Sequence, residues 1–228
     1  MNKKKLVISS GAGISAESGI KTFRDADGLW ENYPVMDVAS HEGFLRNPAL
    51  IHKFYNERRE QLINAQPNAA HKGLVELEKD FDVRVITQNV DDLHERAGSK
   101  RILHMHGDLM KLRCMKDERH EFMFDGEETL ETKCPFCGAK TRPDIVFFEE
   151  VPLYMDMIQD ALKECDEFVY IGTSSVVYPA AGFKSFAHSF GAKVTCLNLE
   201  IPDRDPYTDV AIEGKATEIV PQWCKNFK

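Results

Sequence analysis

The sequence predicts an open, mostly parallel α/β sheet with helices on both faces. Four short runs rich in valine and isoleucine are typical of strands, and stretches with helical periodicity lie between them. This alternation favours a parallel sheet, because parallel strands are joined by crossover helices. The predicted strands often end at glycine, serine or asparagine, and ligands of such sheets gather at the carboxyl ends of the strands.

The predicted elements follow one another through most of the chain. The strands are Lys5–Ser9, Val83–Thr87, Phe168–Gly172 and Lys193–Asn198, and the helices are Pro48–Asn64, Asn68–Lys79, Pro152–Glu164 and Pro179–Phe190. Two segments interrupt the pattern: a mainly helical insert (26–66) and a charged segment with three of the six cysteines, called here the cysteine lobe (107–144). We therefore expect a sheet domain made of 1–25, 67–106 and 145–228, and a small domain made of the insert and the cysteine lobe.

Composition predicts a folded, soluble protein in which small anionic ligands could still bind locally. The 228 residues are 43% hydrophobic and 29% charged, which is ordinary for a globular chain. The net charge of -8 argues against a broad nucleic-acid interface. The apolar run Leu6–Ile8 is too short for a signal peptide or a membrane span, and the scattered cysteines fit a reducing compartment. We expect a cytoplasmic monomer that binds neither nucleic acid nor membranes.

A glycine turn follows the first predicted strand. Its glycines at 11, 13 and 19 do not fit the G-x-G-x-x-G dinucleotide motif, and no acid follows at the usual distance. Gly11 and Gly13 still allow a close backbone approach to an anion, with the amides of Ile14, Ser15 and Ala16 opening a helix toward it. A lone turn of this kind is more often a simple connection. The polar strand ends IGTSS and CLNLE strengthen the ligand interpretation.

Another polar strand end supplies candidate catalytic groups. The segment TQNVDD carries Gln88, Asn89 and Asp91, which we expect at the same sheet edge. His104 and His106 lie two residues apart, so only one of them faces the cleft if the chain is extended. A lone histidine is more often structural than catalytic. The glycine that follows His106 favours this residue, since it opens the backbone for a substrate.

The combined motifs resemble a known family. GAGISAESGIKTFR, DGLW, TQNVDDLHERAG, HMHGDL, GTSSVVYPAA and NLE are similar to the motifs of the sirtuins, the NAD-dependent protein-lysine deacylases. They span nearly the whole chain in the family's order, and the similarity is greatest to the bacterial class III type. The resemblance implies a Rossmann-like sheet domain with a small zinc-ribbon-like lobe and a helical insert, NAD as co-substrate, and acylated lysine side chains of proteins as partners.

The resemblance also implies which residues bind NAD. Phe23 would shield the reacting ribose, Arg24 would help to order its loop, and Asn198 and Glu200 would contact the adenine ribose. The implied NAD-binding residues are Gly11, Ala12, Gly13, Ser15, Ala16, Phe23, Arg24, Trp30, Gln88, Asn89, Val90, Asp91, Gly172, Thr173, Ser174, Asn198, Leu199, Glu200 and Ala216.

The family's chemistry assigns further roles. The acyl-lysine carbonyl oxygen attacks the ribose as nicotinamide leaves, and the products are nicotinamide, free lysine and 2′-O-acyl-ADP-ribose. By its motif, His106 would be the general base, with Asn89 and Asp91 as the other catalytic residues. This role needs a mostly neutral imidazole, which an ordinary histidine pKa of about 6.5 permits.

Tyr55 and Arg58 concern the acyl group. Their spacing places them on one face of the helix predicted at 48–64. On spacing alone, a packed tyrosine and a solvated arginine are the simpler interpretation. In class III sirtuins, however, a Tyr-x-x-Arg pair binds the carboxylate of succinyl- or malonyl-lysine, and a guanidinium suits this role because it stays charged. The resemblance thus implies removal of acetyl and of succinyl or malonyl groups, with Ala16 helping to widen the pocket.

The cysteine lobe departs from the family pattern. Structural zinc takes four ligands, often from two C-x-x-C pairs, and here only Cys134 and Cys137 form such a pair. The earlier pair is reduced to Cys114. Asp117, His120 or water could supply the fourth ligand. We expect structural zinc on Cys114, Cys134 and Cys137, and a metal-free lobe with free thiols is the alternative.

Two other functions stay open at the level of the sequence. A protein mono-ADP-ribosyltransferase would use the same ribose carbon with a protein nucleophile, and a catalytically silent NAD-binding interaction module would use none of this chemistry. The presence of Asn89, Asp91 and His106 in their matching motifs argues against silence.

Overall fold

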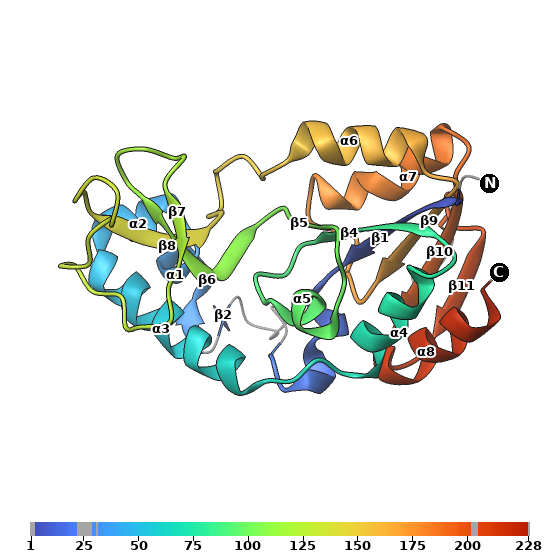
Figure 1. Cartoon of the computed structure of the whole chain (residues 1–228), viewed down its shortest axis with the longest axis horizontal. Coiled ribbons are helices and arrows are strands. Elements are labelled where there is room, and N and C mark those ends of the chain that lie inside the picture. The colour runs from blue at the N-terminus through green and yellow to red at the C-terminus, as the bar shows by residue number, and fades with distance from the viewer. Residues whose placement is uncertain (1–2, 22–28, 31, 202–204, 228) are drawn as a thin grey trace.

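A parallel sheet forms the main body of the computed structural model, which describes residues 3–21, 29–30, 32–201 and 205–227 (Figure 1). Its six strands are β1 (Lys5–Ser10), β4 (Asp82–Thr87), β5 (Ile102–His104), β9 (Glu167–Ile171), β10 (Lys193–Asn198) and β11 (Val210–Glu213). Their order across the sheet is β11-β10-β9-β1-β4-β5. The chain adds strands on one side of β1 and then, from β9 onward, on the other. The topological switch point therefore lies between β1 and β9, where such sheets bind ligands.

Helices cover both faces of this sheet, as predicted. Helices α4 (Ala69–Leu77) and α8 (Ala216–Asn226) pack in one core, and α6 (Met155–Glu164) and α7 (Phe183–Ser189) pack in the other. Strand β1 contributes Leu6 and Ile8 to the first core and Val7 to the second, because successive side chains of a strand point to opposite faces. The α/β fold class predicted from the sequence is confirmed.

The cysteine lobe and the helical insert pack together at the other end of the molecule from β11 and α8 (Figure 1). Strands β6 (Gly107–Cys114), β7 (Glu121–Met123) and β8 (Thr141–Ile145) form an antiparallel sheet in the order β7-β6-β8. The insert provides the short pair β2 (Leu29–Trp30) and β3 (Tyr33–Pro34) and the helices α1 (Val35–Val38), α2 (His41–Arg46) and α3 (Pro48–Asn64). Phe44, Phe54, Tyr55, Leu109 and Phe147 belong to their shared core.

Most predicted elements lie within one residue of their observed bounds. Helix α3 matches at both ends, because Asn47 caps it by accepting a hydrogen bond from the Leu50 amide and proline occupies its first turn. The sequence prediction missed β5 and β11, which are short edge strands, and α8, whose internal Pro221 is a helix-breaking signal. The short helix α5 (Leu93–Ala97) lies between β4 and β5. No helix in the described part of the chain is long and apolar enough to cross a membrane.

The first residue of β6 permits a close contact between strands. Gly107 has φ of +89°, and a Cβ there would lie 1.9 Å from the carbonyl oxygen of Asp144 in β8. Gly19 has almost the same angle, +88°, but no described atom lies within 4 Å of a Cβ placed on it. The two glycines therefore separate the effect of backbone angle from the effect of contact.

We predict that Gly107→Ala lowers the free energy of unfolding by about 3 kcal/mol or more, because the new methyl group must displace β8. Gly19→Ala should cost only about 1 kcal/mol, the cost of the left-handed backbone angle. Urea denaturation of both variants measures the difference. Equal losses would contradict the argument from contact with β8.

Candidate functional site

A cavity of about 690 Å³ lies between the parallel sheet and the small domain elements. Its wall includes the carboxyl ends of β1, β4, β9 and β10, the helix α3, and the segment 145–152. The cavity therefore opens at the topological switch point of the sheet. The predicted residues that line it are Gly11, Ala12, Gly13, Ser15, Ala16, Tyr55, Arg58, Gln88, Asn89, Val90, Asp91, His106, Gly172, Thr173, Ser174, Asn198, Leu199 and Ala216.

Four predicted residues do not appear in this wall. Glu200 is not among the cavity-lining residues of the described part of the chain. Phe23 and Arg24 lie outside the described residues, and so does the side chain of Trp30. The wall also contains residues that the sequence analysis missed, among them Phe147, Phe148 and Tyr178. Aromatic residues that follow a strand in the sequence were the available signal for these.

Backbone hydrogen bonds join the strand ends that form the cavity floor. The Gly13 amide donates to the Gly172 carbonyl (2.8 Å), and the Gly172 amide donates to the Leu197 carbonyl (3.1 Å). A Cβ on Gly13 would lie 2.7 Å from the Cα of Gly172, so neither turn tolerates a side chain at the contact. The loops after β1 and β9 thus meet backbone to backbone.

The prediction that a helix opens directly after the glycine turn is wrong. The turn continues instead as two short 3-10 helices, Ala12–Ile14 and Ala16–Ser18. The amides of Ile14 and Ser15 donate to the carbonyls of Gly11 and Ala12 (both 3.1 Å). These two amides are therefore occupied within the turn and do not serve an anion as expected.

Asn89, Asp91 and Ser15 form a buried polar group in the cavity wall. The Ser15 hydroxyl donates to Asp91 Oδ2 (2.9 Å), and Asn89 Nδ2 donates to the Gly11 carbonyl and to Ser15 Oγ (both 3.2 Å). Burial raises the pKa of Asp91 to about 6, although the hydrogen bonds from Ser15 and from the Leu93 amide act in the opposite direction. The three side chains hold one another in fixed orientations.

Two buried histidines adjoin this polar group. His71 Nε2 lies 3.5 Å from Ser15 Oγ, His94 Nε2 lies 2.9 Å from Ser10 Oγ, and the two rings are 5.0 Å apart. Burial lowers the pKa of His71 to about 4 and that of His94 well below its ordinary value. Both rings are therefore neutral at pH 7. No motif in the sequence analysis had pointed to His71.

His106 lines the cavity with a defined tautomer. Its Nδ1 lies 2.9 Å from the carbonyl oxygen of Gln88, and because a carbonyl only accepts, Nδ1 carries the proton. In the neutral ring, Nε2 is then the unprotonated nitrogen. Burial lowers the pKa of His106, although the bond to Gln88 acts to raise it, so the ring is mostly neutral at pH 7.

His104 has a different environment. Its Nε2 lies 2.7 Å from Glu95 Oε1, and it is not among the described residues that line the cavity. Although burial favours the neutral ring, the Glu95 carboxylate raises the pKa of His104. Of the two histidines in this motif, only His106 combines a position in the cavity wall with a neutral ring.

Tyr55 and Arg58 reach the cavity from α3. Burial raises the pKa of Tyr55 far above its ordinary value, against the effects of Arg142 and Arg58, so its phenol remains a hydrogen-bond donor. The side chain of Arg58 is only 10% exposed and stacks over the Phe54 ring, 4.4 Å from its centroid. Its buried Nε and Nη1 have no hydrogen-bond partner among the described residues. Buried donors without a partner beside a cavity fit an anionic ligand.

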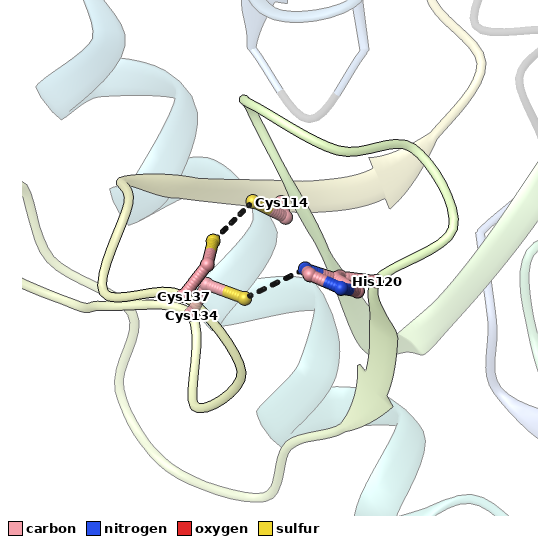
Figure 2. Close-up of side chains that lie close together, drawn as sticks. All are labelled: Cys114, His120, Cys134 and Cys137. Carbon is pink, nitrogen blue, oxygen red and sulfur yellow. Dashed lines mark hydrogen bonds between the residues drawn. The ribbon is translucent and has the colours of Figure 1, made fainter.

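Three cysteines and one histidine converge in the cysteine lobe (Figure 2). The Sγ atoms of Cys114 and Cys137 are 3.5 Å apart, and Cys134 Sγ lies 3.6 Å from His120 Nδ1. Tetrahedral zinc with bonds of about 2.0–2.3 Å separates its ligand atoms by about 3.3–3.8 Å. The four groups therefore fit structural zinc in a Cys₃His site, and none of them lines the cavity.

The structure identifies His120, and not Asp117, as the residue that can complete the metal site. His120 brings a ring nitrogen within 4.8 Å of all three thiols, whereas Asp117 is held by two side-chain bonds from Arg119 (2.9 and 2.7 Å). Although burial acts to raise it, the pKa of the Cys114 thiol is lowered to about 6, chiefly by the amides of Lys116 and Asp117. A lowered thiol pKa favours the thiolate that binds metal.

Comparisons with known proteins agree on one family. The sequence matches the Sir2 family over residues 11–179. It is 52% identical to an NAD-dependent protein deacylase of Pasteurella multocida, over 98% of this chain and 97% of that protein. It is 48% identical to one of Shewanella oneidensis, over 95% and 91%. A crystal structure of a Sir2 homolog–NAD complex matches with a TM-score of 0.89 and 37% identity, over 98% of this chain and 89% of that one.

We predict that the protein purified without chelator contains about one zinc ion per chain, as a four-ligand structural site requires. His120→Ala should weaken zinc binding by about 100-fold, because it removes a ligand, and Asp117→Asn should weaken it much less. Metal analysis and competition with a chromogenic chelator give both quantities. A zinc content far below one, or a greater loss in the Asp117 variant, would contradict this ligand set.

Proposed function

The chain belongs to the Sir2 family and is an NAD-dependent protein deacylase, and we propose that His106 is its general base and that Tyr55 and Arg58 admit acyl groups ending in a carboxylate. The observation that carries the first proposal is the hydrogen bond from His106 Nδ1 to the Gln88 carbonyl. It leaves the lone pair of Nε2 available on a ring that lines the cavity. The Sir2 homolog solved with NAD supports a nucleotide in the corresponding cavity.

NAD, when bound, supplies the ribose carbon from which nicotinamide leaves and to which the acyl oxygen is transferred. The chain's contribution is to orient and to move a proton. The buried bonds among Asn89, Ser15 and Asp91 fix polar groups beside the reactants, and such preorganised groups need no rearrangement during the reaction. His106 Nε2 would take the proton of a ribose hydroxyl, and with one water consumed the products would be free lysine, nicotinamide and 2′-O-acyl-ADP-ribose.

The acyl proposal depends on the unsatisfied donors of Arg58. A succinyl or malonyl carboxylate would accept hydrogen bonds from the buried guanidinium nitrogens and from the protonated Tyr55 phenol. An acetyl group ends in a methyl group and has no carboxylate to accept these bonds. The same site would remove acetyl groups without this contribution.

Further proposals concern the domain boundaries of the enzyme, its oligomeric state and its compartment. We place its domain boundaries as predicted, since all six strands of the parallel sheet fall within 1–25, 67–106 and 145–228. We propose that it acts as a cytoplasmic monomer on acylated lysines of proteins, without direct contacts to nucleic acid or membranes. The six free cysteines and the net charge of -8 support the compartment and the absence of nucleic acid.

His106→Asn should lower kcat/KM for an acetyl-lysine peptide by about 100-fold or more, the usual contribution of a general base. His104→Asn should stay within about threefold, because that ring lies outside the cavity.

In the unchanged enzyme, kcat/KM should fall as the pH drops below 6.5, since His106 has a lowered pKa and must be neutral to act, and Asp91 titrates near 6. Nicotinamide release measures both effects.

An active His106 variant, or an acid limb with an apparent pKa above 7, would contradict this assignment. Mass analysis of the peptide product is the further control. Bare lysine supports deacylation, whereas ADP-ribose retained on the peptide would identify a mono-ADP-ribosyltransferase.

Arg58→Met should reduce kcat/KM for a succinyl-lysine peptide by about 10- to 100-fold, the value of a hydrogen bond between charged groups. Activity on the matching acetyl-lysine peptide should change by less than about threefold. Lys53→Met is the matched control, because it removes the same charge from an exposed position of α3. Equal losses for the two peptides would remove Arg58 from acyl recognition.

A further inference from the structure

One acidic residue of the cysteine lobe is buried against α3. Glu128 lies between β7 and Cys134 in the segment DGEETLE and is 1% exposed, whereas the neighbouring Glu127 is exposed. Burying a carboxylate costs free energy unless it is paired and hydrogen-bonded. The contacts of the Glu128 side chain and backbone should therefore explain why this residue is buried.

Glu128 uses both its side chain and its backbone to join α3 to β8. Its Oε2 lies 3.0 Å from His52 Nδ1, a close contact without hydrogen-bond geometry, and its Oε1 accepts a hydrogen bond from the Thr141 hydroxyl (3.0 Å). Asn56 Nδ2 donates to the Glu128 carbonyl (2.8 Å), and the Glu128 amide donates to Asn56 Oδ1 (3.0 Å). His52 and Asn56 belong to α3, and Thr141 begins β8, four residues after the metal-site residue Cys137.

A buried cation extends this contact along the same face of the helix. Arg59, 1% exposed, donates from Nη1 to Asn56 Oδ1 (2.8 Å) and from Nε to the Leu109 carbonyl (3.0 Å). Its guanidinium also lies 5.6 Å from the ring centroid of Phe124, in the segment that leads to Glu128. Polar contacts with the cysteine lobe thus hold α3 over two turns.

The face held in this way is next to the face that forms the acyl site. With 3.6 residues per turn, His52, Asn56 and Arg59 share one face, and Tyr55 and Arg58 lie about a quarter turn away around the helix. Any rotation of α3 about its axis therefore moves the Arg58 guanidinium relative to the cavity. The hydrogen bonds between Asn56 and the Glu128 backbone oppose such a rotation, and the Glu128 carboxylate, held by Thr141, adds its close contact with His52.

We propose that Glu128 is a positioning residue for acyl selectivity, through which the cysteine lobe sets the orientation of α3 and of the Tyr55–Arg58 pair. This inference rests on the proposed role of Arg58 in binding the acyl carboxylate. An acetyl group carries no carboxylate for that pair to bind, so we expect its turnover to depend little on the orientation of α3. A displacement of about 1 Å in a binding group can cost as much as 100-fold in rate.

The test compares succinyl- and acetyl-lysine peptides of one sequence in the full-length enzyme. Glu128→Ala should raise KM for the succinyl peptide about tenfold, with kcat and both acetyl constants within about twofold. Glu127→Ala removes an equal charge from an exposed neighbour and should leave all four constants unchanged. Thr141→Val removes only the hydroxyl donor to Glu128, and should raise the succinyl KM about threefold even if Glu128→Ala does not fold.

Arg58→Met, assayed in parallel, separates the possible failures. If Arg58→Met selectively loses succinyl activity but Glu128→Ala and Thr141→Val reduce both activities equally or neither, the positioning role is wrong and the acyl site stands. If Arg58→Met lowers both activities equally, both the acyl site and the positioning role are wrong. A succinyl-specific rise in KM in all three variants, with Glu127→Ala unaffected, supports the proposal.

Discussion

The cavity depends on a contact between two glycine backbones. Gly13 follows β1 and Gly172 follows β9, and their amide–carbonyl bond of 2.8 Å joins the two strands at the point where the strand order reverses. Side chains at either position would force the loops apart, since a Cβ on Gly172 would lie 2.4 Å from the Ile14 amide nitrogen. The close approach is what lets the ends of four neighbouring strands form one continuous floor. The position of the polar groups above it follows from this contact.

Polar groups near this floor fall into two kinds. Asn89, Asp91 and Ser15 satisfy one another, and a satisfied buried network is rigid because every member loses a bond if it moves. Arg58 is the opposite case, since two of its buried nitrogens have no hydrogen-bond partner among the described residues. The first arrangement is suited to holding reactants in place, as proposed, and the second leaves hydrogen-bonding capacity for a ligand. The cavity wall therefore contains both a rigid, hydrogen-bonded polar group (Asn89, Asp91 and Ser15) and a cationic side chain, Arg58, with hydrogen-bond donors available to a ligand.

The sequence correctly predicted those strands and helices whose formation depends on local sequence pattern. The four central strands and α3 follow from apolar runs, caps and periodicity, so their bounds are nearly right. The metal site could be predicted only in part, because spacing identified Cys134 and Cys137 but could not choose between Asp117 and His120, which depends on how β6 and β7 pair. His71 and Glu128 were missed for the same reason. Their burial is created by contacts with residues more than ten positions away, which leave no local signal.

The polar attachment of α3 has a physical rationale beyond stability. Burying the Glu128 carboxyl group beside His52 adds little net free energy, because desolvation offsets much of what its polar contacts gain. Apolar packing of Phe54 and Leu62 in the lobe core supplies the non-directional part of the attachment. That kind of contact tolerates small rotations of a helix, whereas hydrogen bonds weaken steeply as their angles change. If α3 presents the Arg58 guanidinium to a ligand as proposed, directional contacts are needed to fix its angle, and the Glu128 amide and carbonyl provide them from the cysteine lobe, which also contains the four residues of the metal site.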